Sequence, residues 1–278
     1  MTIPSLEDML KAGVHFGHRT SRWHPKMKPF IFGVRGGVHV IDIEQTQTQL
    51  EKTLQYVEGL VSRGGAVLYI GTKPQVTELV KKAALDAGMP YVPNRWLGGT
   101  FTNFEEIKKL VDPYLDLRDK RDKGELKKYT KLEQLNFDRK IDELEEKIGG
   151  ISTHAKALPE AIFVVDVRFD KTAVMEARNR GVKVIGLVDT NVNPDLVDHI
   201  VPCNDDSVNA VEMMLEQMNG AVKAGKAKQK TVAPKAAKPA AKAAPKAVPV
   251  KEESKAAVED LDDAVKDELA RAKEEEKK

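Results

Sequence analysis

The sequence predicts an α/β fold in which helices cover both faces of a parallel sheet. Short apolar runs rich in β-branched residues alternate with amphipathic segments of helical period, and the runs are apolar at consecutive positions. Consecutive apolar positions are typical of strands that are buried on both faces, as they are in parallel sheets. A charged stretch at residues 104–148 interrupts the alternation and predicts an inserted helical element.

The first half of the chain is expected to supply three helices and three strands. In order, they are a helix at 5–12, a strand at 38–42, a helix at 46–62, a strand at 66–70, a helix at 72–87 and a short strand at 89–92. Thr72 and Gln75 stand three residues apart, which predicts a capping box at the start of the third helix. Gly64-Gly65 and Gly88 are expected to end the second and third helices, because glycine is typical of positions just after a helix.

The second half continues the alternation after the charged stretch. Its expected elements are strands at 161–167, 182–188 and 200–201, a helix through Ala173, Val174 and Ala177, and a final helix at 208–218. Strands that alternate with helices in this way are typical of doubly wound sheets. The pattern predicts a flavodoxin-like sheet of five parallel strands.

The charged stretch at 104–148 is expected to form two amphipathic helices joined near Lys123-Gly124. Apolar residues of the second helix follow spacings of four, three and four, which is a heptad seam: Phe137, Ile141, Leu144 and Ile148. We expect a protruding antiparallel coiled-coil hairpin, because the outer faces are too charged to bury. A helical lid lying flat on the sheet is the alternative. Pro113 predicts a kink or a restart in the first helix.

Charge divides the chain into an α/β domain at residues 1–222 and a low-complexity tail at 223–278. The net charge is +2, but residues 223–250 carry eight lysines and no acid, and residues 251–278 carry eleven acids and seven bases. Residues 1–222 therefore hold 30 bases and 32 acids, so any nucleic-acid contact must come from local patches. The tail, rich in Ala, Lys and Pro and then acidic, is expected to be disordered.

Composition and motifs narrow the class of protein. Cys203 is the single cysteine, which rules out an internal disulfide and fits a reducing cytoplasm. No apolar run reaches the roughly 18 residues of a membrane span, and the acidic N-terminus does not match a secretory signal. The motifs GxGxxG, GxxxxGK[ST] and GxSxG are absent, so we expect no enzyme, no required cofactor and no membrane contact.

The segment from Lys11 to Arg35 has the composition of a nucleic-acid contact surface. It carries six Lys or Arg residues and no acid, with aromatic residues and glycines between them. Cations meet phosphates, and flat rings can cover sugars or bases. The residues predicted to contact RNA here are Arg19, Arg22, Trp23, His24, Lys26, Lys28 and Arg35. A basic loop folded over a core, with its aromatic rings buried, is the alternative.

Two further segments could contact RNA. The loop at 94–103 combines polar, aromatic and glycine residues, and its predicted contacts are Asn94, Arg95, Trp96, Thr100 and Asn103. Trp96 could instead plug the edge of the sheet. The loop Gly71-Thr72-Lys73 follows a strand and could place Lys73 against one RNA phosphate, although a nucleotide site in an enzyme or sensor is the alternative.

Acidic residues collect where the predicted strands end. Asp189 and Asp205 are the candidates for a divalent metal, Zn²⁺ or Mg²⁺, with a histidine of the His15-x-x-His18 pair as a further ligand. The competing interpretation is that these acids cap helices and turns, because Asp189 precedes Thr190-Asn191 and Asp205 precedes a helix.

Taken in order, the motifs resemble those of the bacterial small-subunit ribosomal protein S2 family over residues 1 to about 220. They are HFGH at 15–18, RWHPKM at 22–27, IFGVR at 31–35, VID at 40–42, GTK at 71–73, NRWLGGT at 94–100, GGI at 149–151, LP at 158–159, VDTN at 188–191 and NDD at 204–206. The tail lies outside this resemblance.

The resemblance implies a structural protein that binds small-subunit ribosomal RNA between the head and the body of the subunit. It also implies neighbouring ribosomal proteins as partners, docking of the mRNA-binding ribosomal protein S1 for translation initiation, and a cytoplasmic, ribosome-bound location. In some members of the family a metal lies near the segments that hold Asp189 and Asp205. We expect no homo-oligomer. A scaffold whose hairpin binds only protein is the remaining alternative.

Overall fold

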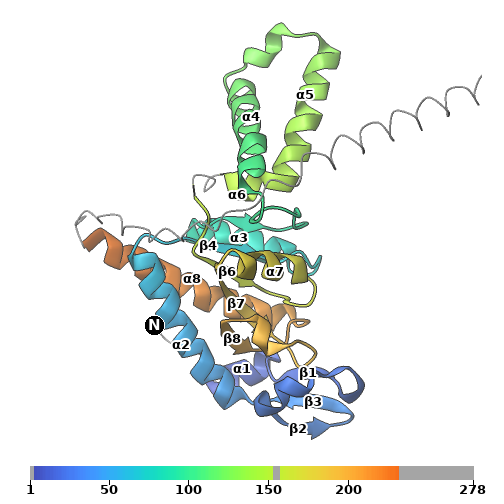
Figure 1. Cartoon of the computed structure of the whole chain (residues 1–278), viewed down its shortest axis with the longest axis vertical. Coiled ribbons are helices and arrows are strands. Elements are labelled where there is room, and N and C mark those ends of the chain that lie inside the picture. Colours follow the sequence, from blue (N-terminus) through green and yellow to red (C-terminus); the bar gives the residue numbers. More distant parts are fainter. Residues whose placement is uncertain (1–2, 153–156, 232–278) are drawn as a thin grey trace, which may run out of the picture. The chain divides into compact units, whose positions relative to one another are not determined.

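Five parallel strands form the central sheet of the computed structural model, which describes residues 3–152 and 157–231 (Figure 1). In spatial order they are Tyr91–Val92 (β5), Val67–Ile70 (β4), Ala161–Val164 (β6), Lys183–Val188 (β7) and His199–Pro202 (β8). Each neighbouring pair is parallel. Counted along the chain, these strands have the order 2-1-3-4-5, which confirms the predicted flavodoxin-like sheet.

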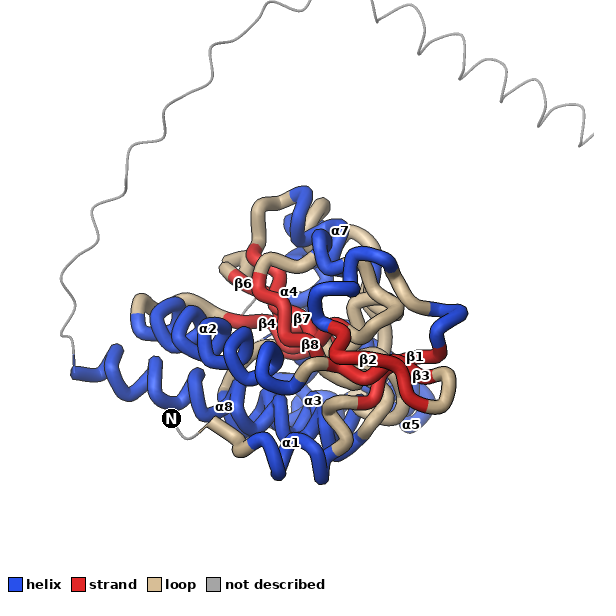
Figure 2. Tube along the Cα trace, turned by 90° about the horizontal axis from the view of Figure 1, so that it is seen from below, coloured by secondary structure: helices blue, strands red, loops and turns tan. Residues whose placement is uncertain are grey.

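Helices cover both faces of this sheet because side chains alternate along each strand. One face packs Tyr69 and its neighbours against Leu6–Ala12 (α1), Ile43–Ser62 (α2), Thr77–Ala87 (α3) and Val208–Thr231 (α8). The opposite face packs Leu68 and Ile70 against Lys171–Asn179 (α7) and the loop that holds Trp96. Figure 2 shows α2 and α8 on one side of the strands and α7 on the other.

The start of α3 differs from the prediction. The helix begins at Thr77, and its N-cap residue Val76 makes no side-chain capping bond. The Thr72 hydroxyl instead donates to Asp170 Oδ1 at 2.6 Å. The predicted capping box is therefore wrong, because a buried carboxylate on a neighbouring loop competes for the same hydroxyl. The end of the helix is as predicted, with Gly88 in the left-handed region at φ 58°.

The strand predicted at 38–42 does not join the parallel sheet. It forms Val38–Ile41 (β3), the middle strand of a separate antiparallel sheet with Phe16–Arg19 (β1) and Ile31–Arg35 (β2). Gly36 and Gly37 connect β2 to β3 with φ of 59° and 77°, which suits a two-residue hairpin turn. Two 3-10 helices, Thr20–Arg22 (η1) and Pro25–Phe30 (η2), link β1 to β2.

The insertion is a helical hairpin with a hydrophobic core of its own. It consists of Phe104–Asp122 (α4), a 3-10 turn at Glu125–Lys128 (η3), Lys131–Leu144 (α5), a π-helical turn at Glu145–Gly149 (η4) and Gly150–Ser152 (α6). The heptad seam packs in this core, where Ile141 and Ile148 are buried. Helix α4 runs unbroken through Pro113, so the predicted restart does not occur. Figure 1 shows α4 and α5 side by side and standing away from the sheet.

The last helix is longer than predicted. Helix α8 runs to Thr231, beyond the domain boundary expected at residue 222. Lys226 Nζ donates to the carbonyl oxygens of Ala87 and Gly88 at 2.7 and 3.0 Å, so this extension packs against the end of α3. The rest of the predicted tail, from residue 232 onward, lies outside the described residues.

Candidate nucleic-acid interface and acidic cluster

The five predicted cations of the N-terminal segment are exposed on β1, β2 and the 3-10 helices between them. We call this set the N-terminal basic surface: Arg19, Arg22, Lys26, Lys28 and Arg35. Lys26 forms an ion pair with Asp195. Among the described residues, no carboxylate lies within ion-pair distance of the other four. Exposed cations without protein counter-ions are available to phosphates.

Aromatic residues of this surface divide into exposed and supporting rings. Phe16 and Phe32 are 53% and 80% exposed, although neither belongs to the predicted contact set. Trp23 is half-buried, with its ring centroid 5.1 Å from that of His39. His24 is also half-buried, and its backbone N–H donates to the Thr190 carbonyl at 2.7 Å. The predicted contacts Trp23 and His24 therefore serve partly to hold the surface in place.

The predicted RNA contacts in the loop at 94–103 also divide into exposed and buried side chains. Asn94, Arg95 and Asn103 are exposed. Trp96 and Thr100 are only 8% and 1% exposed, and the Thr100 hydroxyl donates to the Leu97 carbonyl at 2.6 Å. These two side chains therefore support the loop from inside. For Trp96 this agrees with the alternative interpretation, in which its ring packs against the sheet and does not contact RNA.

Glu176 on α7 anchors this loop. Its carboxylate accepts hydrogen bonds from the backbone N–H of Gly99, Phe101 and Thr102 at 2.8, 3.0 and 3.3 Å. The Trp96 indole N–H donates to the same carboxylate at 3.3 Å. Sequence analysis did not identify Glu176, because nothing in its helix distinguishes it from an ordinary surface acid.

Lys73 does not lie on an exposed surface. Its Nζ lies 2.5 Å from Asp206 Oδ1, 3.4 Å from Asp166 Oδ2 and 3.6 Å from Asp205 Oδ1. Its side chain is only 17% exposed. Partial burial lowers the pKa of Lys73, but the Asp206 hydrogen bond and the charges of Asp205 and Asp166 outweigh this, so the net pKa is raised. Three carboxylates already neutralise this lysine, which argues against both a phosphate contact and a nucleotide site.

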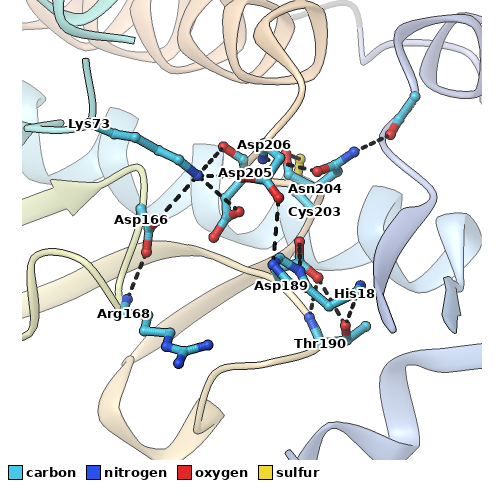
Figure 3. Close-up of polar contacts among 11 residues, drawn as sticks. His18, Lys73, Asp166, Arg168, Asp189, Thr190, Cys203, Asn204, Asp205 and Asp206 are labelled. Carbon is cyan, nitrogen blue, oxygen red and sulfur yellow. Dashed lines mark hydrogen bonds and ion pairs between the residues drawn. The ribbon is translucent and has the colours of Figure 1, made fainter. Parts of the chain in front are cut away.

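The acids predicted as metal ligands do come together, at the carboxyl ends of the parallel strands (Figure 3). Asp189 and Asp205 are 0% and 2% exposed. With His18 they offer three ligand atoms that all lie within 4.8 Å of one another. His18 Nδ1 is 3.0 Å from Asp189 Oδ2, and His18 Nε2 is 3.5 Å from Asp206 Oδ2. We call His18, Asp189 and Asp205 the acidic cluster; His15 is not part of it.

Electrostatics of this cluster reflect crowded negative charge. Burial, together with the charges of Asp166 and Asp189 and against the opposing effect of Lys73, raises the pKa of Asp205 to about 7. The hydrogen bond to Asp189 raises the pKa of His18 in spite of partial burial. Protons and Lys73 therefore balance the carboxylates, which is the role that a divalent cation can also fill.

Two carboxylate oxygens of the cluster are buried, Asp189 Oδ2 and Asp205 Oδ1. Each faces a cationic side chain: His18 Nδ1 lies 3.0 Å from the first and Lys73 Nζ 3.6 Å from the second. The other Asp189 oxygen accepts from the Thr190 hydroxyl at 3.0 Å, so local hydrogen bonding holds that carboxylate in place. One imidazole nitrogen and two carboxylate oxygens are suitable ligands for Zn²⁺. These residues thus fit a divalent metal, while Asp166 caps a turn by accepting from Arg168 and Phe169 N–H at 2.9 and 2.8 Å.

The fold and these surfaces define a flavodoxin-like α/β protein with an inserted helical hairpin, an exposed basic surface and a buried acidic cluster. The family model for ribosomal protein S2 matches residues 9–225, and the chain belongs to this family. It is 43% identical over 228 residues to the small ribosomal subunit protein uS2 of Psychrobacter sp. (strain PRwf-1). That alignment covers 82% of this chain and 87% of the relative.

Family membership confirms two predictions from the sequence. The resemblance to the S2 family is correct, and the family is structural rather than enzymatic. Within residues 3–152 and 157–231, no helix combines the length and the apolar character that crossing a membrane requires.

Proposed function

We propose that this chain is a structural constituent of the small ribosomal subunit and that it binds small-subunit ribosomal RNA through the N-terminal basic surface and the loop at 94–103. Family membership supports the place in the subunit. The observation that carries RNA binding is the set of exposed cations without protein counter-ions, including Arg19 and Arg22, beside exposed Phe16 and Phe32. Such a surface presents charge to phosphates and flat rings to bases.

The mechanism that follows is positioning. The antiparallel sheet and the Glu176-anchored loop hold cations at fixed places before RNA arrives, so little side-chain and loop entropy is lost on binding. Arg22 in the N-terminal basic surface and Arg95 in the loop at 94–103 are both exposed and are the cations chosen to test this contact. The expected binding place, between the head and the body of the subunit, rests on the family resemblance.

Further partners belong to this proposal. Neighbouring small-subunit proteins are expected, and docking of ribosomal protein S1 rests on family membership rather than on a particular contact. The protein then works as one copy in the cytoplasm, bound to ribosomes, away from membranes and without forming a homo-oligomer.

Sucrose-gradient fractionation of a lysate tests the proposal at moderate and then high salt. We expect the chain to migrate with free small subunits and with whole ribosomes at moderate salt. Migration at the top of the gradient at both salt concentrations would contradict a role as an integral ribosomal protein.

A divalent metal at the acidic cluster is a second proposal, and it is supported by the two buried carboxylates of Asp189 and Asp205, whose ligand atoms lie within 4.8 Å of each other and of a His18 nitrogen. No cofactor is needed for the proposed positioning role, so a metal would serve structure alone. The test is metal content of the purified full chain together with its melting temperature after chelation. We expect bound Zn²⁺ or Mg²⁺, with metal lost from Asp189→Asn. Metal-free protein whose melting is indifferent to added Zn²⁺ and Mg²⁺ would exclude this site.

A further inference from the structure

The end of the helical hairpin carries a second concentration of positive charge. We call residues 120–131 the hairpin tip; they include six Lys or Arg residues and two acids. Further along α5 and into η4, residues 142–146 carry four acids and no base. The tip lies on the far side of the parallel sheet from β1, β2 and β3 (Figure 1). It is therefore separate from the N-terminal basic surface.

Cations along the hairpin differ in their ion pairs, and within the tip Lys120 pairs with Asp116 at 2.5 Å and Arg121 lies 3.6 Å from Asp142. On the flanks, Lys108 pairs with Glu105, Lys109 with Glu106 and Lys147 with Glu143, at 3.0, 2.6 and 2.5 Å. At the tip, four exposed lysines have no carboxylate within ion-pair distance among the described residues: Lys123, Lys127, Lys128 and Lys131. Exposed ammonium groups without protein counter-ions are available to phosphates.

An exposed aromatic ring stands among these lysines. Tyr129 is 40% exposed, and the Nζ of Lys128 lies 5.3 Å from the centroid of its ring. Phe137 on α5 supports the same ring from inside the hairpin, at 5.2 Å and an interplanar angle of 63°. A ring that is fixed on one edge and open to solvent can stack on an unpaired base.

The hairpin tip is preorganised. Leu126 inserts into the core of the hairpin and is only 8% exposed. Thr130 and Glu133 form a capping box that begins α5, and Gln134 Nε2 donates to the Tyr129 carbonyl at 2.7 Å. These contacts fix the turn without an ion pair to Lys123, Lys127, Lys128 or Lys131, and the Lys128 ammonium lies over the Tyr129 ring.

We infer that the hairpin tip is a second RNA-contact surface, in which Lys127, Lys128 and Lys131 meet phosphates and Tyr129 stacks on an unpaired base. Unpaired ammonium groups beside an open aromatic ring match single-stranded or looped RNA better than an acidic protein surface, which needs no stacking platform. The inference deepens the proposed function and rests on it. Two RNA contacts on one chain bind more tightly than either alone, because the second contact forms intramolecularly.

The experiment measures binding of the full chain to deproteinised small-subunit ribosomal RNA over a range of salt concentrations. The tip variant is K127Q/K128Q/K131Q. The matched control, K108Q/K109Q/K147Q, removes the same charge from lysines that already have partners on the flanks. We expect the tip variant to bind roughly 100-fold more weakly and its slope of log affinity against log salt to fall by about 2 to 3, whereas the control should resemble wild type.

A tyrosine pair tests the stacking contact separately. Tyr129→Phe should keep wild-type affinity, because the ring remains. Tyr129→Leu should weaken binding several-fold without changing the salt slope, because no charge is lost. Circular dichroism of each variant checks that the hairpin stays helical. Equal affinity of Tyr129→Leu and wild type would overturn the stacking contact.

The outcomes separate this inference from the proposed function. If wild type binds the RNA and the tip variant equals the control, the tip does not contact RNA and the inference fails while the proposed function stands. If the tip variant binds naked RNA normally but no longer enters small subunits, the tip contacts protein and the inference also fails. If wild type itself shows no affinity for the RNA, the proposed function fails.

Discussion

The carboxylate of Glu176 on α7 accepts the backbone N–H of Gly99 at 2.8 Å, although 77 residues separate the two in the chain. This contact ties the 94–103 loop, which carries the exposed Arg95, to the α/β core. Burial raises the pKa of Glu176, but hydrogen bonds from Gly99, Phe101 and Trp96 outweigh this, so the net pKa is lowered. The ionised carboxylate therefore contributes to stability, and this contribution is lost as the pH falls through the lowered pKa.

Glu176→Gln should loosen the loop. The amide keeps the size of the side chain but offers one acceptor oxygen where the carboxylate has two, and its NH₂ group would face N–H donors. Hydrogen bonds to a charged group are worth more than neutral ones, so the expected loss of stability is about 2 kcal/mol. Urea unfolding measures this loss, and hydrogen exchange should locate the new mobility at residues 97–102. Glu212→Gln, at an exposed position on α8, is the control. Unchanged exchange in the loop would contradict the anchoring role.

Asp170 predicts a pH dependence of stability. Burial raises its pKa to about 6, in spite of the hydrogen bonds from Thr72. Because the folded pKa lies above the unfolded value of 3.8, the folded state binds the extra proton. Its contribution to stability is thus fully present below pH 3.8 and is lost as the pH rises through 6.

Asp170→Asn should remove this dependence while keeping an acceptor for Thr72. The variant is expected to gain about 2 kcal/mol relative to wild type between pH 4 and pH 7, because a shift of one pKa unit is worth about 1.4 kcal/mol. Urea unfolding at both pH values measures the difference. A constant gap between the two proteins across this range would show that Asp170 ionises normally in the fold.

Ile141 tests whether the hairpin is an independent cooperative unit. The side chain is 0% exposed and belongs to a cluster that shares no buried residue with the two cores of the sheet. Ile141→Ala should cost about 2 to 5 kcal/mol. We expect hydrogen exchange to rise in α4 and α5 while β4 and β6 stay protected. Ile162→Ala in β6 is the converse control, and loss of protection everywhere in Ile141→Ala would contradict independence.

Two arginines test the proposed RNA interface. Arg22→Ala and Arg95→Ala should each weaken incorporation into small subunits, because one charged phosphate contact is worth on the order of 1 kcal/mol. Both residues are exposed, so the melting temperature should stay at the wild-type value. Lys52→Ala, on the exposed side of α2, is the control. Wild-type incorporation of both arginine variants would show that these residues do not face RNA.

The parallel sheet and the hairpin could be predicted because their apolar periodicities are local. The seam that contains Ile141 and the buried run at Ala161–Val164 are visible in a few consecutive residues. The antiparallel sheet was missed, because the segment from Lys11 to Arg35 was interpreted as a nucleic-acid contact surface and no strand was predicted in it, although β1 and β2 both lie there. Two adjacent glycines between short β-rich runs were the available indication.

Predicting the site was harder, because side-chain direction depends on partners that are distant in the chain. Arg95 and Trp96 are neighbours in the same motif, yet Trp96 turns inward to Glu176 and Arg95 stays exposed. Lys73 was predicted to contact a phosphate. In the fold, however, three carboxylates that follow other strands surround its ammonium group. The meeting of His18, Asp189 and Asp205 was predictable in part, because strand ends of a parallel sheet lie at one edge.

Gly17 provides a test of how β1 is joined to the acidic cluster. A Cβ atom at this position would lie 2.6 Å from Thr190 Cγ2, 2.9 Å from Thr190 Oγ1 and 3.1 Å from the His39 carbonyl oxygen. Thr190 is 0% exposed, and its hydroxyl oxygen accepts the His18 N–H at 2.8 Å, so it cannot easily move aside. Gly17→Ala should therefore cost about 1 to 3 kcal/mol and displace His18 from the cluster.

A double-mutant cycle isolates this contact from general damage to β1. Thr190→Ser removes the methyl group that the new Cβ meets first but keeps the hydroxyl that holds His18. We expect G17A/T190S to be less destabilised than the sum of the two single variants by about 1 kcal/mol, because residues in contact are not additive. Urea unfolding of the four proteins gives the coupling energy. Simple additivity would mean that the cost does not arise at the Thr190 methyl group but at the two oxygen atoms that Thr190→Ser leaves in place, Thr190 Oγ1 and the His39 carbonyl oxygen.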